Sequence, residues 1–380
     1  MHTVAFIERI YNTNLPLLST TDEAQLILED LERFEISPPV YHLLKSKELL
    51  DEVPEFISAA LKMKTERVFF NNLFIRSEMR RLLSRMDELQ IDVIPLKGVQ
   101  LAETYFGHLS ARGTSDIDLL IRPMDLQRTS ELLEKLGYEK EDEADSAHFH
   151  QVYTKSFSNQ LFDSLSVEIH WNILRGHTSN TQVDALWEQA EPMLPYRYVH
   201  ELTTQHTFYH LCLHGYNHHI LSLKYVIDIV HFLYTKAEHI DYSELFEQAK
   251  RDGNYSKMII VLTHVYDLFP SLRAARPLPE EKRWPLWDLQ LMRKQVADVK
   301  DMQYYLFRMF STFMTYDQLS HSVAHLRYMI FPPRDFASFQ LTTAQNKHKS
   351  LIGLYGHVYS RRMRQLFTAY QARKNEQKGH

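Results

Sequence analysis

Three hydrophobic patterns follow one another along the chain. From about residue 20 to residue 90, apolar residues recur three and four positions apart between charged ones, which predicts amphipathic helices. Between residues 91 and 172 the apolar runs become short, as in VIPL, DIDLLI, HQVYTKSF and SVEIHWNI, and these runs predict strands. A helical pattern, DLQRTSELLEKLGY, separates the second run from the third. The middle of the chain therefore predicts a small unit of mixed helix and strand.

Helical periodicity returns after about residue 180. The longest stretch is HTFYHLCLHGYNHHILSLKYVIDIVHFLYT, and YSELFEQAKRDG and KMIIVLTHVYDLF follow it. The proline-containing segments PSLRAARPLPEEKRWP and FPPRDF predict breaks between helices. We therefore predict an α+β fold in which a small mixed β-sheet core at 91–180 is flanked by helical regions at 1–90 and 181–380.

Composition supports a globular protein with a sizeable core. Of the 380 residues, 44% are hydrophobic, and only 10 are glycine and 14 proline, which leaves little room for long flexible linkers. The net charge of -5 gives no overall attraction to nucleic acid. A basic cluster within the last twenty residues is either a solvated helix end or a local contact for phosphate or lipid.

Cysteine usage and apolar run length bear on the cellular compartment. Cys212 is the only cysteine, so an intrachain disulfide and a thiolate metal cluster are both excluded. No run approaches 18 apolar residues, and the first residues lack the pattern of a secretion signal. We expect a cytoplasmic protein with no membrane partner.

Two aspartates in the run DIDLLI are the first candidate functional residues. Side chains alternate between the faces of a strand, so Asp116 and Asp118 project from one face, with alpha carbons about 7 Å apart. Carboxylates this close repel one another unless a cation or a proton lies between them. Oxygen ligands of this kind suit Mg²⁺ or Mn²⁺ better than zinc. The pair predicts a divalent metal site, against the plainer interpretation of a solvated strand face.

The run SVEIHW offers a third carboxylate. Val167, Ile169 and Trp171 would point to one face of this strand. Glu168 and His170 would therefore project together from the other face. On a neighbouring strand, Glu168 would complete a site for two metal ions that polarise a phosphoryl group. His170 is either a residue of the same cleft or a surface histidine.

The segment before the aspartates has the features of a phosphate-binding loop. VIPLKG predicts a strand that runs into a glycine, and VQLAETYF predicts a helix that begins there. Gly98 would let phosphate oxygens approach backbone amides at the start of this helix. Lys97 and Arg112 would add positive charge, and Arg112 can hold oxygens in a bidentate fork. Ser115 is either a hydrogen-bond donor or a strand cap.

Histidines recur at four-residue spacing, at His206, His210, His214 and His218, on one predicted helix. Each step of four drifts by about 40° because a helix has 3.6 residues per turn, so the whole row cannot face a single metal ion. We expect packing, hydrogen bonding or substrate contact here rather than a zinc site. Asp228, inside the apolar run YVIDIVHFL, either pairs with a basic residue or helps to form the wall of a cleft.

Residues 93–121, VIPLKGVQLAETYFGHLSARGTSDIDLLI, resemble the uncharacterised bacterial nucleotidyltransferase family of the polymerase-beta-like superfamily, often encoded beside peptide natural-product genes. The same stretch is similar to nucleotidyltransferase-like toxins of bacterial toxin–antitoxin systems. LEKLGY, VEIHW, HLCLHG, LKYVIDIVHFL and FPPRDF extend the resemblance over most of the chain. The chain departs from the superfamily in three ways: Val99 follows the loop glycine, the gap to the first aspartate is longer, and the third acid is glutamate.

The resemblance implies a role for each candidate residue. Asp116, Asp118 and Glu168 would be the catalytic residues and the ligands of two Mg²⁺ or Mn²⁺ ions. By the same resemblance Lys97, Gly98 and Arg112 would bind the nucleotide, and His214, which matches the helical motif, would line the nucleotide cleft. From the residue pattern we add Ser115 and His170 as candidate nucleotide-binding residues.

We therefore predict a metal-dependent nucleotidyltransferase. It would move a nucleoside monophosphate from a nucleoside triphosphate to an unidentified acceptor and release pyrophosphate. The acceptor would be a small molecule, a peptide such as a natural-product precursor, or a protein. Two alternatives stay open: a catalytically weak or inactive nucleotide-binding scaffold, and a toxin-like enzyme that modifies tRNA.

Overall fold

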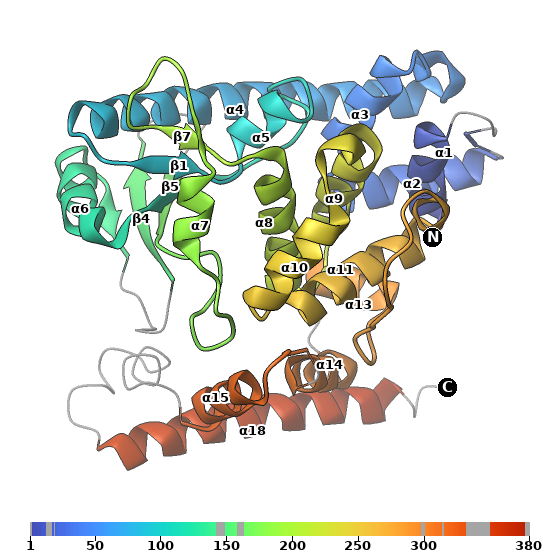
Figure 1. The fold of residues 1–380 in the computed structure, drawn as a ribbon. Helices are drawn as coiled ribbons and strands as arrows, with labels where there is room; N and C mark the ends of the chain where they lie inside the picture. Colours follow the sequence, from blue (N-terminus) through green and yellow to red (C-terminus); the bar gives the residue numbers. More distant parts are fainter. Residues whose placement is uncertain are drawn as a thin grey trace.

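The protein is described by a computed structural model that covers residues 2–12, 17–18, 20–141, 149–157, 163–297, 301–313, 315–331 and 350–376. It confirms the predicted α+β fold, because a mixed sheet of five strands is preceded and followed by helices (Figure 1). Most of the predicted break FPPRDF lies outside the described residues.

The five strands lie in the order β1-β2-β5-β4-β3. Their bounds are Val93–Pro95 for β1, Asp116–Ile121 for β2, Glu139–Lys140 for β3, His150–Ser156 for β4 and Ser164–His170 for β5. All four apolar runs that predicted strands form β1, β2, β4 and β5. Strands β2 and β5 are parallel, and every other neighbouring pair is antiparallel. No apolar run in the sequence predicted β3 or the separate antiparallel pair of β6 (Glu191–Pro192) and β7 (His200–Glu201).

Side-chain alternation gives the sheet one apolar and one polar face, as predicted. Ile117 and Leu119 of β2 and Val167 and Ile169 of β5 are buried in one cluster with the second half of α4 (Glu55–Glu88). This 34-residue helix is about 50 Å long and runs along the whole molecule in Figure 1. The carboxylates of β2 and β5 therefore lie on the face turned away from α4.

The helices before and after the sheet share a second hydrophobic core. The helices before the sheet are α1 (His2–Tyr11), α2 (Thr21–Arg33), α3 (Ser37–Ser46) and α4, and those after it include α8 (Thr204–Asn217), α9 (Leu223–Thr235), α10 (Tyr242–Arg251) and α11 (Tyr255–Leu268). Phe6 of α1 and Phe34 after α2 are buried in the same cluster as Phe208 of α8 and Tyr266 of α11. Segments about 200 residues apart thus form one core beside the sheet.

Shorter helices surround this framework. Within the sheet region they are α5 (Val99–Thr104), α6 (Leu126–Lys135) and α7 (Val183–Glu188). The predicted connector after α11 contains the short α12 (Ser271–Ala275), and α13 (Leu289–Val296) follows it.

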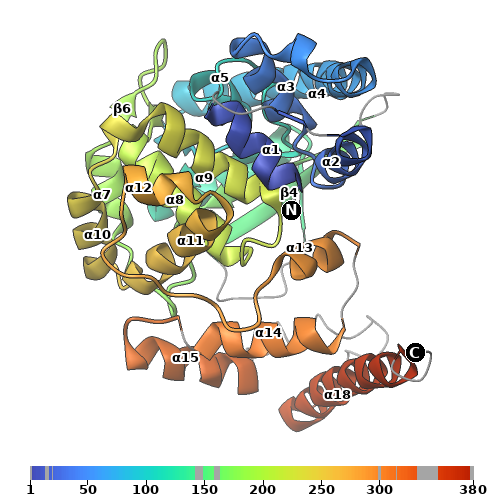
Figure 2. The same ribbon diagram turned by 90° about the vertical axis from the view of Figure 1, so that its right-hand side faces the viewer.

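A last layer consists of α14 (Met302–Phe313), α15 (Leu319–Ile330) and α18 (Leu351–Glu376). These helices lie below the rest of the molecule in both ribbon views (Figures 1 and 2). Leu354 and Val358 of α18 are buried in a small cluster of their own. None of the helices in the described ranges combines the length and the hydropathy that crossing a bilayer requires.

Candidate active site

The parallel pairing of β2 with β5 brings the predicted acidic residues together. Asp118 lies directly opposite Glu168 in the register, and Asp116 lies opposite Ser166. Since side chains alternate along both strands, the carboxylates of Asp116, Asp118 and Glu168 project from the same face. The expectation that the acidic strands are neighbours is therefore confirmed.

A group of three side chains on this face could hold a metal ion. One ligand atom from each of Asp118, Glu168 and His170 lies within 4.8 Å of the others. The Nε2 atom of His170 is 3.2 Å from Oδ1 of Asp118 and 3.3 Å from Oε2 of Glu168. The sequence had predicted Asp116, Asp118 and Glu168 as the metal ligands, whereas this close group contains His170 in place of Asp116.

The donor atoms of this group fit a divalent cation. The Oδ2 atom of Asp118 is buried and has no hydrogen-bond partner in the part of the chain that the structure describes. A buried carboxylate oxygen without a hydrogen bond destabilises the folded state, and a bound cation would supply the missing partner. Two carboxylates suit Mg²⁺ or Mn²⁺, and the imidazole adds a ligand that transition metals favour.

Lys97 supplies positive charge between the aspartates. Its ammonium is 3.0 Å from Oδ1 of Asp118 and 3.9 Å from Oδ2 of Asp116. Burial by itself would lower the pKa of Lys97, but the charges of the two aspartates outweigh burial and raise it. Burial would likewise raise the pKa of Asp118, yet Lys97 and the hydrogen bond from His170 hold it well below its usual range. Asp118 is therefore ionised and Lys97 charged at neutral pH.

Asp116 is the less compensated of the two aspartates. Burial and the charge of Asp118 raise its pKa, and Lys97 only partly opposes them. Its Oδ1 accepts a hydrogen bond of 3.3 Å from the Thr114 hydroxyl. The ionised form of Asp116 would consequently gain from a further cation.

Gly98 allows the close turn between β1 and α5. Its φ of +75° lies in the left-handed region that favours glycine. A Cβ atom there would be 3.4 Å from Oγ1 of Thr114 and 3.5 Å from the Asp116 carbonyl oxygen, which are ordinary contacts, so the backbone conformation and not a lack of space disfavours a side chain. As predicted, the helix begins at Val99. The turn places Lys97 against the aspartates.

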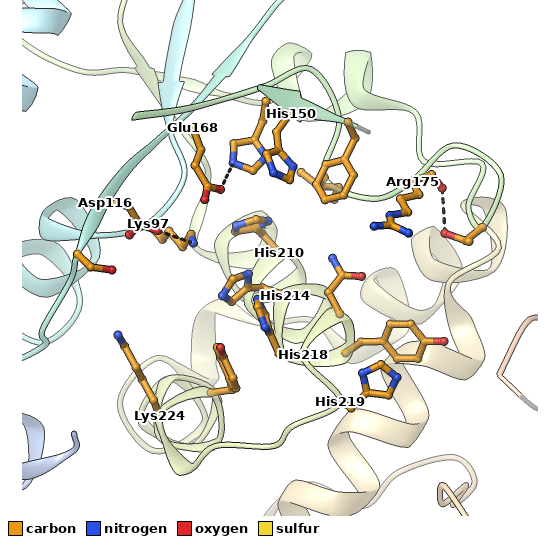
Figure 3. Close-up of a pocket in the computed structure, with 18 of the residues that line it drawn as sticks. Lys97, Asp116, His150, Glu168, Arg175, His210, His214, His218, His219 and Lys224 are labelled. Carbon is orange, nitrogen blue, oxygen red and sulfur yellow. Dashed lines mark hydrogen bonds and ion pairs between the residues drawn. The ribbon is translucent and has the colours of Figure 1, made fainter. Parts of the chain in front are cut away.

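The polar face of the sheet opens into a cavity of about 550 Å³, which is within the usual range for small-molecule sites. Among the predicted site residues, those that line it are Lys97, Arg112, Ser115, Asp116, Glu168, His170 and His214. Asp118 is buried behind this lining, and Gly98 does not belong to it. Figure 3 shows Lys97, Asp116 and Glu168 on one side of the cavity and Arg175 on the other.

Comparison with known proteins identifies the family. Residues 20–270 match a family described as uncharacterised nucleotidyltransferase. The chain belongs to this family. No curated protein sequence gave a significant match. The match to the nucleotidyltransferase family includes the acidic strands and α8, whereas α14, α15 and α18 lie beyond it.

Arg112 of this nucleotidyltransferase family member is already engaged by a carboxylate. Its Nε and Nη2 atoms donate hydrogen bonds of 2.7 and 2.8 Å to the two oxygens of Asp228. Of the two interpretations of Asp228, pairing with a basic residue is therefore the one observed. The fork that we predicted would hold phosphate is occupied by Asp228, although Arg112 belongs to the lining of the cavity.

The α8 histidines divide into two groups. His210, His214 and His218 line the cavity, and His206 does not. The sequence had placed His218 within this helix, but the helix ends at Asn217 and His218 is its C-cap. Burial, followed by the charge of Lys97, lowers the pKa of His210 to about 3 and that of His218 to about 4. These rings are neutral at neutral pH and offer hydrogen bonds without charge.

Sequence reasoning did not select several residues that line the cavity. These residues include Lys224, Tyr225, Arg175 and Arg308. The side-chain ammonium of Lys224 has no hydrogen-bond or ion-pair partner within the described residues, and burial followed by the charge of Arg112 lowers its pKa. A lysine in the first turn of α9 is itself a signal, because the helix dipole disfavours a cation there. No sequence signal of this kind singles out Arg308.

Proposed function

We propose that this protein is a metal-dependent nucleotidyltransferase of the polymerase-beta-like type. It transfers a nucleoside monophosphate from a nucleoside triphosphate to a small molecule, a peptide or a protein and releases pyrophosphate. The group formed by Asp118, Glu168 and His170, in a chain of this family, is the observation that carries the proposal.

The charge of the cavity supports an anionic substrate. Among the residues that the structure describes, its lining contains five lysines and arginines and two carboxylates, although the whole chain carries a net charge of -5. These basic residues are Lys97, Arg112, Arg175, Lys224 and Arg308. An excess of positive charge on a concave surface raises the local concentration of anionic ligands. This excess of positive charge favours a triphosphate as the ligand.

Two cations complete the proposed site. Asp118, Glu168 and His170 would hold one ion, and Asp116 with Asp118 would hold a second. When bound, Mg²⁺ or Mn²⁺ neutralises charge on the transferred phosphoryl group.

The protein's own groups bind and orient the substrate. Lys97 and Lys224 bind phosphate oxygens, and Ser115, exposed at the edge of the cavity, offers a hydroxyl donor. The rings of His218 and Tyr225 are stacked, with centroids 4.7 Å apart and an angle of 13° between their planes. Both line the cavity, and this flat surface receives the nucleobase by stacking.

The transfer step is an in-line displacement at phosphorus. The acceptor hydroxyl oxygen forms a bond with the α-phosphorus, and the bond from that phosphorus to the oxygen bridging to the β-phosphate breaks. Pyrophosphate leaves with the electron pair of that bond. Glu168, which faces the cavity, accepts the proton of the hydroxyl.

Nucleotide binding and transfer test the proposal together. We expect the melting temperature to rise with one or more of the four nucleoside triphosphates in the presence of Mg²⁺ or Mn²⁺, and mass spectrometry of cell-extract fractions to detect a nucleotidylated product. Asp118→Asn should abolish both results, whereas Asp92→Asn, a carboxylate paired with Arg122 outside the cavity, should retain them. Transfer by Asp118→Asn at the wild-type rate would refute the site.

A further inference from the structure

His210 is a buried residue of the cavity lining whose two ring nitrogens are both unpaired. It lies on α8 and is only 5% exposed. Neither Nδ1 nor Nε2 has a hydrogen-bond partner within the ranges that the structure describes. Buried polar groups in folded proteins are almost always hydrogen-bonded, and an unpaired one destabilises the folded state. These two nitrogens therefore have the features of groups whose partners belong to a ligand.

The chemistry of the ring restricts what this ligand can be. Burial, followed by the charge of Lys97, lowers the pKa of His210, so the ring is neutral. A neutral imidazole has one nitrogen that donates a hydrogen bond and one that accepts. An ionised phosphate oxygen can only accept, so it cannot satisfy the second nitrogen. A metal ion could, but the close group found among the described residues does not include His210. The accepting nitrogen consequently requires a donor such as a hydroxyl or an N–H group.

The position of His210 favours the hydroxyl. Figure 3 shows His210, His214 and His218 in a row that leads away from Glu168. Neighbouring rings of this row have centroids 6.1 and 4.6 Å apart. The proposed function, on which this inference rests, places the transferred phosphate beside the acidic group and the nucleobase against His218 and Tyr225. Because the ribose connects the base to the phosphate, its hydroxyls are the donors of the nucleotide that lie nearest His210.

We propose that His210 binds a ribose hydroxyl of the nucleoside triphosphate. The hydroxyl donates a hydrogen bond to the unprotonated ring nitrogen. An analogue without this hydroxyl leaves the nitrogen unpaired, and sites that hydrogen-bond a substrate hydroxyl discriminate against analogues that lack it. The substrate class is thereby a nucleotide with an intact ribose.

Titration calorimetry on the full chain with Mg²⁺ tests the proposal. The ligands are three non-hydrolysable triphosphate analogues, with ribose, 2′-deoxyribose or 3′-deoxyribose, built on the base whose triphosphate raises the melting temperature most. We expect the wild type to bind at least one deoxy analogue at least tenfold more weakly than the ribose analogue. His210→Phe keeps a flat ring without hydrogen-bonding atoms, and it should bind all three with affinities within about twofold.

His206→Phe is the matched control. His206 is buried one turn earlier in α8 and lies outside the cavity lining, so this variant should keep the wild-type preference. Melting temperatures without ligand separate binding from structure. His210→Phe removes two unpaired polar atoms, so it should melt no lower than the wild type.

Three results would overturn the proposal. The wild type could bind all three analogues equally, His210→Phe could keep the wild-type preference, or it could lose more thermal stability than His206→Phe, which would indicate a structural role for the ring. Failure of the proposed function looks different, because the wild type would then bind none of the analogues, and the ribose site would fail with it.

Discussion

Arg112 and Asp228 form a buried, bidentate ion pair across the molecule. Hydrogen bonds of 2.7 and 2.8 Å join them, and 116 positions separate them in the chain. The backbone carbonyl of Arg112 also accepts a hydrogen bond of 2.8 Å from the side chain of Asn72 on α4. The pair therefore holds the segment before β2 against α9. Residues of both elements line the cavity, so the pair also holds these two parts of its wall together.

Breaking this pair should destabilise the fold. Asp228→Asn leaves the charge of Arg112 buried without its partner, and we expect a loss of about 3 to 5 kcal/mol in the free energy of unfolding, measured in urea. The exposed pair Arg85–Glu88 on α4 is the matched control, and Glu88→Gln should cost less than about 1 kcal/mol. Equal losses in the two variants would contradict a structural role for Asp228.

Glu168 should be needed for metal affinity. Glu168→Gln removes the charge that faces Asp118 across the two strands, and we expect Mn²⁺ affinity, measured by calorimetry, to fall by about 100-fold or more. Changes to groups that merely support metal ligands already cost roughly 10- to 100-fold. Glu139→Gln, an exposed residue on β3 of the same sheet, should bind Mn²⁺ normally. Unchanged Mn²⁺ affinity in Glu168→Gln would show that Glu168 is not a metal ligand.

Lys224 should contribute to nucleotide binding more than to turnover. Loss of one charge-assisted hydrogen bond to phosphate in Lys224→Gln should raise KM for the nucleoside triphosphate by about 10- to 100-fold, with a smaller change in kcat. Lys236→Gln, at the other end of α9 and outside the cavity lining, provides the comparison. A KM equal to that of the wild type would exclude Lys224 from phosphate binding.

His264 should make stability depend on pH. Its Nε2 atom accepts a hydrogen bond of 3.0 Å from the backbone N–H of Trp284, so this nitrogen must carry no proton. Burial lowers the pKa of His264 to about 4, and the nearby charges of Asp267 and Arg283 act in opposite directions. In the unfolded chain the ring titrates near its ordinary pKa of about 6.5. The stabilisation is therefore complete above that pH and is lost as the pH falls towards 4.

The measurement compares unfolding free energies at pH 7 and pH 5. His264 should account for a loss of about 2 kcal/mol over this interval, which His264→Gln should not show. His239→Gln, at an exposed histidine, should lose stability with pH as the wild type does. A wild-type pH profile in His264→Gln would contradict the prediction.

The strands and their faces followed from the sequence. Alternation along a strand is a local property, so DIDLLI and SVEIHW were sufficient to place Asp116, Asp118, Glu168 and His170 on common faces. The register that sets Asp118 opposite Glu168 was not contained in either run. It depends on how the intervening 40 or so residues fold back to make the two strands parallel neighbours, and that is a property of the whole sheet.

The partners of the charged groups were decided only by tertiary packing. The sequence marked Lys97 as a charge at the end of an apolar run and Asp228 as a charge within one, and it singled out Arg112 as a candidate phosphate ligand. It did not determine that Asp228 binds the fork of Arg112, that Lys97 lies between the aspartates, or that Arg308 reaches the cavity from α14. The contact between Arg112 and Asp228 joins residues 116 positions apart, and the strength of such contacts depends on burial. Both the distance and the burial exist only once the sheet, the helical core and the last helical layer have packed together.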